Sequence, residues 1–320
     1  MARRIGEFEL IARYFAPLAR GFKGARGLKS DNAFLAADAR HDLVVKTDGI
    51  VAGVHFLADE KPEWVAARAL RVCLSDLAAG GAKPFAYQLS LSLAKSWTER
   101  WIAGFARGLA ADQQRYGIVL SGGDTSGTPG PTTITITAFG KVARGKGLGR
   151  DGARPGDELW VSGTIGDAAL GLLVARRRLT GVSLEARYRL PQPRTALGPR
   201  LIGIARATAD ISDGLLADAG HIAEASRLAV HIERECVPLS AAARRAVRSD
   251  PSLWANVLGG GGDYELVISV PARRRRALLA AARVAQIKVS RIGSFRRGRG
   301  VHLTIAGRET RVGRKGYVHF

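Results

Sequence analysis

The sequence contains very little cysteine. Its 320 residues include two cysteines, Cys73 and Cys236, and these do not form a CxxC pair. Disulfide frameworks and thiolate metal sites need several cysteines at short, regular spacing. We therefore expect neither a disulfide framework nor a zinc site, and the composition suits a reducing cytoplasm.

Long apolar runs are also absent. No uninterrupted apolar stretch reaches the roughly 18 residues that a membrane span requires. Glu7 and Glu9 interrupt the N-terminal region before any stretch typical of a secretory signal. We expect a cytoplasmic protein with no membrane partner.

Several common catalytic signatures are missing as well. The sequence has no GxxxxGK[ST] phosphate-binding loop and no GxSxG nucleophile elbow, and it shows no Ser-His-Asp or Cys-His arrangement. These absences exclude a P-loop enzyme and leave no recognisable set of residues for nucleophilic catalysis.

Negative charge is scarce. The chain has 49 Lys and Arg against 28 Asp and Glu, a formal net charge of +21. Such a charge can indicate nucleic-acid binding. However, the basic residues are dispersed, and aromatic residues are not interleaved with them as a base-stacking surface requires. The pattern argues against nucleic acid as a partner and favours a solvated, Arg-rich surface that steers anionic substrates toward a cleft.

Against this background, carboxylates occur in six short motifs with small or glycine neighbours. They are residues 30–32 (SDN), 47–49 (TDG), 75–77 (SDL), 122–125 (GGDT), 210–214 (DISDG) and 261–264 (GGDY). Carboxylates on glycine-flanked turns suit Mg²⁺, which takes oxygen ligands and usually shares them with substrate phosphates. The motifs predict a magnesium-dependent enzyme that acts on phosphate groups.

Two of these motifs also have a purely structural interpretation. At residues 122–124 a strand is expected to end, where backbone N–H groups can bind a phosphate and Asp124 a metal; a hairpin turn is the alternative. In residues 210–214 the two carboxylates can flank a metal cluster, while Ser212 or Asp213 can cap the following helix.

Asp48, Asp76 and His55 differ in their surroundings. Asp48 follows a short apolar strand, whereas Asp76 lies inside an apolar helical pattern. A carboxylate buried there is costly unless it is paired, hydrogen-bonded or metal-bound. The alternative for Asp76 is a half-exposed position beside an arginine such as Arg71. His55, next to Phe56, is of a kind more often packed and hydrogen-bonded in a core than catalytic.

Periodicity predicts helices and strands in both halves of the chain. Helices are expected at 7–20, 62–79, 98–116, 167–178, 215–226 and 273–284, strands at 43–45, 87–93, 118–120, 132–140, 158–162 and 266–270, and a mobile loop at 21–30. The glycine-rich run 144–157 marks a boundary between two domains, 1–148 and 149–320. The fold class is α+β, with mixed α/β elements in both domains.

Taken in order, the motifs resemble the thiamine-monophosphate kinase family, whose superfamily includes aminoimidazole ribonucleotide synthetase and selenophosphate synthetase. The resemblance runs from residue 6 to residue 320 and rests on residues 47–48 with 53–56, 74–79, 122–125, 149–153 with 155–157, 162–164 with 166–167, 211–214 and 263–266. It implies ATP-dependent phosphorylation of thiamine monophosphate to thiamine diphosphate. It also implies a two-domain synthetase-type architecture, a homodimer whose N-terminal domains form a β-barrel, a C-terminal α/β domain, and ATP held between the two domains.

The resemblance further implies roles for single residues. Metal ligands would be Asp31, Thr47, Asp48, Asp76, Asp124, Asp210 and Asp213, of which Asp48, Asp124 and Asp213 would be central to catalysis. The nucleotide would contact Gly123, Asp124, Arg150 and Ser212, and the substrate would contact His55, Tyr317 and the position of Gly262. Phosphoryl transfer to an anionic phosphate oxygen needs positioning and charge neutralisation more than a general base. Several Mg²⁺ ions together with Arg150 would supply both.

Three positions depart from the family pattern. One of two adjacent carboxylates is missing in residues 29–33 (KSDNA), Cys73 stands where an Asn is usual, and Gly262 replaces an acidic residue that contacts substrate. These departures keep two alternatives open: a related superfamily enzyme that uses ATP to activate another acceptor, and a catalytically degenerate paralogue that binds nucleotide.

Overall fold

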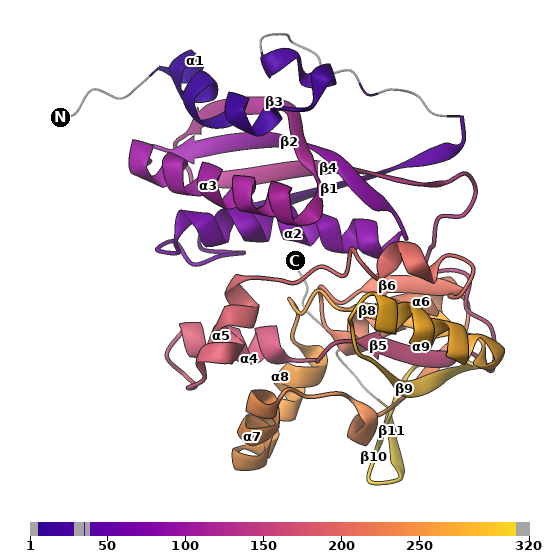
Figure 1. Cartoon of the computed structure of the whole chain (residues 1–320). Coiled ribbons are helices and arrows are strands. Elements are labelled where there is room, and N and C mark those ends of the chain that lie inside the picture. Colours follow the sequence, from indigo (N-terminus) through magenta and orange to yellow (C-terminus); the bar gives the residue numbers. More distant parts are fainter. Residues whose placement is uncertain (1–5, 29–34, 36–38, 312–320) are drawn as a thin grey trace. The chain divides into compact units, whose positions relative to one another are not determined.

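The computed structural model describes residues 6–28, 35 and 39–311 (Figure 1). The chain forms two compact units: unit 1 comprises Met1–Leu77 and Lys83–Gly145, and unit 2 comprises Ala78–Ala82 and Lys146–Phe320. Both contain helices and a sheet, so the predicted mixed, two-domain fold class is confirmed. None of the described helices is long and apolar enough to cross a membrane.

Unit 1 is built on a four-stranded sheet in the order β1-β4-β2-β3. Its strands are β1 (His41–Val51), β2 (Lys83–Ala94), β3 (Val119–Thr128) and β4 (Thr133–Ala143). Alternate residues of β4 are buried, which is the pattern of a sheet with one packed face. Figure 1 shows helices α2 (Pro62–Ala79) and α3 (Glu99–Tyr116) on one side of this sheet. The described part of unit 1 contains an open sheet with β1 and β3 as its edges, and not a closed barrel.

Both long helices of unit 1 were predicted to within about a residue. The expected cap of α3 is confirmed, because the Thr98 side chain accepts a hydrogen bond from the Trp101 N–H at 3.2 Å. Gly117 ends the helix in the left-handed conformation, with φ of 64°.

The N-terminal segment is helical, as predicted, but irregular. It consists of α1 (Glu7–Leu10), the π-helical η1 (Ile11–Phe15) and the 3₁₀ turns η2 (Ala16–Ala19) and η3 (Lys23–Leu28). The mobile loop expected at 21–30 is therefore wrong over η3. Ala25 is 2% exposed there, so this turn is held by packing that its Gly- and Lys-rich composition does not reveal.

Strands β1 and β3 extend further than expected. Thr47 and Asp48 lie within β1 and not after it, and residues 122–124 lie within β3, so the hairpin-turn interpretation is wrong. One continuous row of pairing crosses the sheet and explains this: Asp48 pairs with Ile136, Ile136 with Leu89, and Leu89 with Gly123. Backbone pairing thus continues through polar and glycine residues, although the β-propensity of these residues alone predicts that the strand ends there.

Unit 2 is built on a seven-stranded sheet in the order β11-β10-β7-β9-β5-β8-β6. Its strands are β5 (Glu158–Ser162), β6 (Ala207–Asp210), β7 (Ala229–Glu233), β8 (Leu266–Val270), β9 (Val289–Arg296), β10 (Gly300–Ile305) and β11 (Arg308–Arg311). Its helices are α4 (Asp167–Ala175), α5 (Val182–Arg189), α6 (Leu215–Ala225), α7 (Ala241–Ser249), α8 (Trp254–Gly259) and α9 (Arg275–Val284). The predictions for β5, β8, α4, α6 and α9 are confirmed; the others were not predicted.

Candidate functional site

Two of the predicted carboxylates in unit 1 converge on one positive charge. The Lys46 Nζ lies 3.1 Å from Asp48 Oδ1 and 3.3 Å from Asp76 Oδ2. Burial acts to lower the pKa of Lys46, but the two carboxylates outweigh burial and raise it. Asp76 is half-exposed, as the alternative expected, but the cation beside it is Lys46, and Arg71 forms a buried ion pair with Asp112 at 2.7 Å.

Cys73 contributes to the position of Asp48. Its Sγ lies 3.6 Å from Asp48 Oδ2 and 3.4 Å from the Ile136 carbonyl oxygen. Burial, and next the charge of Asp48, raises the pKa of this thiol well above its usual value. The neutral S–H is therefore a weak donor to Asp48, so the cysteine that replaces the usual Asn still contacts this carboxylate.

Asp124 lies on the other face of the same sheet. Asp124 pairs with Ser90, and the next pair along these strands, Ser92 and Ser126, is joined by a hydroxyl hydrogen bond of 3.0 Å. These side chains project from the face opposite to Asp48, whose contacts are with α2. β1 and β3 are three strand spacings apart, roughly 14 Å. Within one copy of unit 1, Asp48 and Asp124 therefore do not meet.

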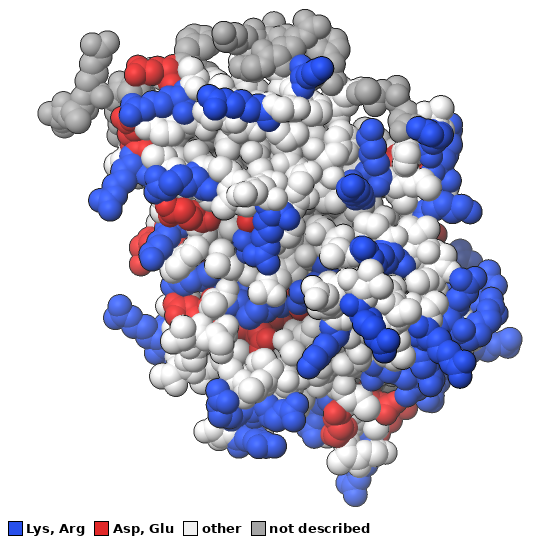
Figure 2. Space-filling view, viewed as in Figure 1, with Lys and Arg blue, Asp and Glu red and all other residues white. Residues whose placement is uncertain are grey.

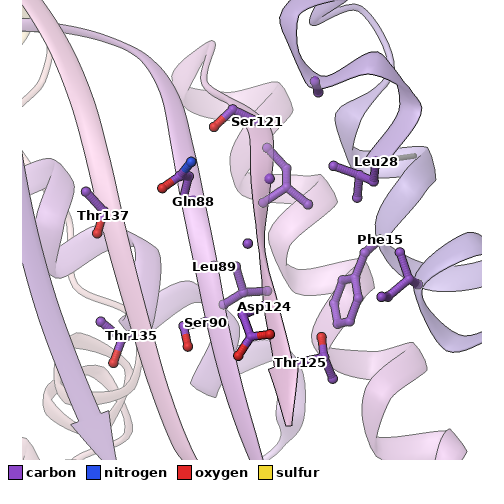
Figure 3. A pocket seen from close by; sticks show the side chains of 15 residues that line it. Phe15, Leu28, Gln88, Leu89, Ser90, Ser121, Asp124, Thr125, Thr135 and Thr137 are labelled. Carbon is purple, nitrogen blue, oxygen red and sulfur yellow. The ribbon is translucent and has the colours of Figure 1, made fainter. Parts of the chain in front are cut away.

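A cavity of about 320 Å³ adjoins Asp124 (Figure 3). One wall is apolar and comes from the N-terminal helical segment, with Ile11, Phe15, Ala25 and Leu28. The polar side comes from the sheet face, with Gln88, Ser90, Ser121, Gly122, Gly123, Asp124, Thr125, Thr135 and Thr137. An apolar wall opposite hydroxyl, amide and carboxylate groups is typical of a small-molecule site.

Gly123 is required by close backbone packing. A Cβ built on it would lie 1.8 Å from the Leu89 carbonyl oxygen, and its φ is 156°. We expect Gly123→Ala to lower the free energy of unfolding by about 1–3 kcal/mol, because β2 and β3 would have to separate next to Asp124. Urea unfolding measures this loss.

Gly127 on the same strand provides the matched control for this substitution. A Cβ built on Gly127 meets no atom within 4 Å, so Gly127→Ala should change stability by less than about 0.5 kcal/mol. Equal effects of the two substitutions would contradict the close-approach explanation.

In unit 2, two predicted motifs lie side by side. The loop after β6 (residues 211–214) and the glycine-rich loop before β8 exchange backbone hydrogen bonds: Gly262 N–H donates to Ser212 O at 2.9 Å, and Tyr264 N–H donates to Ile211 O at 2.9 Å. Asp210 is 2% exposed at the end of edge strand β6. The fold therefore places Asp210, Ser212 and Gly262 in one region.

Asp218 is a site residue that the sequence reasoning missed. Its Oδ2 accepts from the backbone N–H groups of Asp213 (3.0 Å) and Gly214 (3.1 Å), in the loop that leads into α6. The capping expected of Ser212 or Asp213 is wrong, because the N-cap of α6 is Gly214 and no side chain caps it. Burial, and next the charge of Asp213, raises its pKa to about 7. Its Oδ1 is buried without a hydrogen-bond partner among the described residues.

His221 completes a group of possible ligands in this region. One ligand atom each of Asp213, Asp218 and His221 lies within 4.8 Å of the others. Asp218 and His221 are three residues apart on α6, a spacing that places them on one helix face and that was visible in the sequence. Arg150 is exposed, and its positive charge acts to lower the pKa of Asp218, opposite to the effect of burial.

Gly262 has a backbone reason to be glycine. Its φ is 94°, a conformation that strains any residue with a Cβ. We expect both Gly262→Asp and Gly262→Ala to lower the free energy of unfolding by about 1–3 kcal/mol. A carboxylate that contacts substrate should make the KM of Gly262→Asp lower than that of Gly262→Ala. Equal KM values in the two variants would show that the carboxylate makes no contact.

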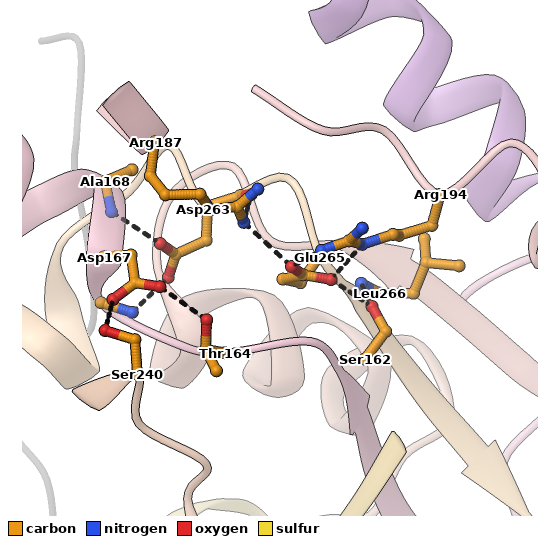
Figure 4. Close-up of polar contacts among 11 residues, drawn as sticks. Ser162, Thr164, Asp167, Ala168, Arg187, Arg194, Ser240, Asp263, Glu265 and Leu266 are labelled. Carbon is orange, nitrogen blue, oxygen red and sulfur yellow. Dashed lines mark hydrogen bonds and ion pairs between the residues drawn. The ribbon is translucent and has the colours of Figure 1, made fainter. Parts of the chain in front are cut away.

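The residues after Gly262 are structural (Figure 4). Asp263 accepts from the N–H groups of Gly166 (2.6 Å) and Ala168 (3.0 Å) and so holds the start of α4; burial raises its pKa to about 7. Glu265 is 0% exposed and binds Ser162, Arg187 and Arg194. These contacts fix the strand that follows the glycine-rich loop.

Three predicted substrate or metal residues remain to be placed. His55 is half-buried after β1, and its Nδ1 accepts from the Val51 N–H at 3.1 Å, so the neutral ring carries its proton on Nε2. Asp31 and Tyr317 lie outside the described residues.

The surface agrees with the basic composition. Figure 2 shows Lys and Arg side chains spread over the face in view, most densely over the part of unit 2 that carries α9. Exposed arginines of this helix and its leading turn include Arg273, Arg274, Arg276 and Arg283. Asp and Glu occupy smaller, separate patches on this face.

The two units define a protein of the AIR synthase related class. The family models for the AIR synthase related protein match in both halves, the N-terminal domain at residues 29–142 and the C-terminal domain at residues 154–306. The chain is 42% identical over 318 residues to the thiamine-monophosphate kinase of Caulobacter vibrioides, covering 98% of this chain and 90% of that protein. This chain belongs to the thiamine-monophosphate kinase family.

Solved structures agree with this assignment. The thiamine-monophosphate kinase of Stenotrophomonas maltophilia is 40% identical with a TM-score of 0.84, covering 93% of this chain and 96% of that one. AaThiL complexed with AMPPCP and TMP is 30% identical with a TM-score of 0.78, and the match covers 100% of both chains.

Proposed function

We propose that this protein is a cytoplasmic, magnesium-dependent kinase that transfers the γ-phosphoryl group of ATP to the phosphate of thiamine monophosphate, giving thiamine diphosphate and ADP. The observation that carries the proposal is the full-length match to AaThiL complexed with AMPPCP and TMP. The P–O bond to the ADP leaving group breaks as an oxygen of the thiamine phosphate bonds to the γ-phosphorus. That oxygen is already anionic, so the side chains have to position and neutralise charge.

The carboxylates of unit 1 suit a hard divalent cation. Asp48 and Asp76 already hold one positive charge, the Lys46 ammonium, between their oxygens, and carboxylate oxygens are the ligands that Mg²⁺ takes. We assign Asp48, Asp76, Asp124 and Thr47 of unit 1, and Asp210 and Asp213 of unit 2, as magnesium ligands, together with Asp31. Bound Mg²⁺ would neutralise phosphate charge.

The cavity beside Asp124 supports a place for the nucleotide. Its apolar wall suits a purine ring, and its hydroxyl and amide groups suit a ribose. Gly123 and Asp124 lie at its sheet side, where a missing Cβ leaves backbone within reach of a ligand. Arg150 and Ser212 of unit 2 would contact phosphate oxygens. His55 of unit 1, together with Tyr317, would contact the thiamine substrate.

A homodimer is the second part of the proposal. The face of the unit 1 sheet that carries Asp124 also carries Leu43 and Val45, which are 51% and 52% exposed on edge strand β1. Exposed apolar side chains beside unpaired strand groups are typical of a pairing surface. A second copy on this face would complete a barrel. It would bring the Asp124-bearing faces of the two sheets together, while each Asp48 stays on the opposite face, toward α2.

Introducing charged side chains on this surface tests whether it forms the dimer interface. The double substitution of Leu43 and Val45 with Lys should convert the dimer to a monomer, because burying two ammonium groups costs more than the apolar contact they replace. Light scattering after gel filtration measures the mass. Val182→Lys is the control, because Val182 is 84% exposed in unit 2. An unchanged mass in the double variant would contradict the proposed surface.

The activity is tested directly with the pure protein, Mg²⁺, ATP and thiamine monophosphate. We expect thiamine diphosphate and ADP in equal amounts, and no product when EDTA is present. Nucleotide binding without any thiamine diphosphate would refute the proposed reaction.

A further inference from the structure

A second cluster of metal-binding side chains lies near the opposite edge of the unit 2 sheet. It consists of His231 on β7, His302 on β10 and Glu309 on β11. Strand β7 is four strand spacings from β6, which carries Asp210, or roughly 19 Å. Within unit 2, the cluster is therefore separate from Asp210 at the end of β6.

Strand pairing brings the three side chains onto one face. His302 pairs directly with His231 in parallel register, and the two rings stack with centroids 4.5 Å apart and planes 8° from parallel. Glu309 pairs with Thr304, two residues along β10 from His302, so its side chain projects from the same face. One ligand atom from each of the three residues lies within 4.8 Å of the other two.

Both imidazoles direct the same nitrogen at the carboxylate. His302 Nδ1 lies 2.7 Å from Glu309 Oε1, and His231 Nδ1 lies 3.5 Å from Glu309 Oε2. The other nitrogen of His302, Nε2, lies 3.2 Å from the Arg299 carbonyl oxygen. A metal ion at Nδ1 would replace the proton that lies between this nitrogen and Glu309, while Nε2–H points at the Arg299 carbonyl, which is the arrangement typical of metal-bound histidine.

The surroundings leave one side of the donor set accessible to solvent. Side-chain exposure rises from 16% for His231 to 25% for His302 and 51% for Glu309, so water can reach the carboxylate side and complete a coordination shell. The positive charge of Arg296 opposes a cation here, and Glu309 offsets it.

We propose that His231, His302 and Glu309 form a binding site for a borderline divalent cation, with Zn²⁺ the best match, that fastens the β10–β11 hairpin to β7. Two imidazoles and one carboxylate are donors that Zn²⁺ takes, whereas Mg²⁺ prefers oxygen ligands alone. The proposal differs from the expectation of no zinc site, which considered cysteine spacing alone. The proposal does not depend on the kinase reaction.

The test uses untagged protein, stripped with EDTA and titrated with Zn²⁺ alone by calorimetry. Because Asp213, Asp218 and His221 form another possible group, each titration is repeated in an Asp213→Asn background. We expect one zinc equivalent whose affinity falls by about 100-fold or more in His302→Ala and by at least about 10-fold in Glu309→Gln. The control His41→Ala, an exposed position in unit 1, should bind like the unaltered protein.

A second measurement, thermal unfolding with and without Zn²⁺, keeps the proposal testable if His302→Ala does not fold. At one fixed Zn²⁺ concentration, the melting temperature should rise more for the unaltered protein than for Glu309→Gln, whose exposed side chain is the least able to disturb the core. Equal zinc affinity in His302→Ala and the unaltered protein would overturn the proposal. Loss of the zinc equivalent in Asp213→Asn would also overturn it. A titration with no zinc equivalent would overturn it too, and would show that the cluster is only an ion pair.

Discussion

Replacing Asp48 with Asn is expected to lower turnover by about 100-fold or more while leaving the fold intact. The substitution removes one of the two carboxylates that converge on Lys46, and with it a proposed magnesium ligand on which charge neutralisation depends. The Asp48 side chain is 29% exposed in a partly solvated ion pair, so stability should change by less than about 1 kcal/mol. Steady-state kinetics over a range of Mg²⁺ concentrations should show an increased magnesium requirement together with the loss of turnover.

Asp59→Asn is the matched control for this substitution. It makes the same change of charge at an exposed position of unit 1, and it should retain turnover within about twofold, as surface substitutions away from a site usually do. Turnover of Asp48→Asn within threefold of the unaltered enzyme, at unchanged magnesium requirement, would count against the assignment of Asp48.

Glu265→Gln is expected to lower the free energy of unfolding by about 3–5 kcal/mol. Glu265 is 0% exposed, and it accepts hydrogen bonds from Ser162 at 2.6 Å, from Arg187 at 2.9 Å and from Arg194. The amide would leave two largely buried guanidinium groups facing a neutral side chain, and its NH₂ group would oppose one of these donors. Urea unfolding followed by circular dichroism measures the loss.

Glu185→Gln tests whether burial is the cause. Glu185 pairs with Arg189 at 2.8 Å in an i,i+4 arrangement and is 31% exposed. Such a helical pair contributes about 0.3–0.5 kcal/mol, so its loss should be much smaller than that at Glu265. A loss below 1 kcal/mol at Glu265 would show that the two arginines find solvent or other partners instead.

The predictions that the structure confirms depend on neighbours in the sequence. Helix α2 begins at Pro62 and α3 begins after the Thr98 cap, because apolar spacing and capping act within one or two turns. The strand predicted at 132–140 is likewise confirmed as β4, with alternating burial. Sequence alone was enough for these elements because the signals that identify them, apolar spacing, capping and alternation, lie within each segment.

The errors have a common physical origin in contacts between distant residues. The strand at 118–120 continues through residues 122–124 because β2 supplies hydrogen-bond partners that a single-strand pattern does not contain. Asp218 was missed because its partners are backbone N–H groups of a loop, which no residue type signals. Glu265 was seen as part of a motif, but Arg187 and Arg194 lie far from it in sequence.

The sequence by itself determined helices α2, α3, α4, α6 and α9, the supply of carboxylates in a basic chain, and the motifs that resemble thiamine-monophosphate kinases, since each is a property of residue type and short spacing. Only the tertiary structure decided which side chains meet. Strand register and the alternation of side chains place Asp48 with Asp76 on one face of a sheet and Asp124 on the other. The same register stacks His231 on His302. Pairing between strands depends on the whole fold, because each strand finds its register from the core that all of them share.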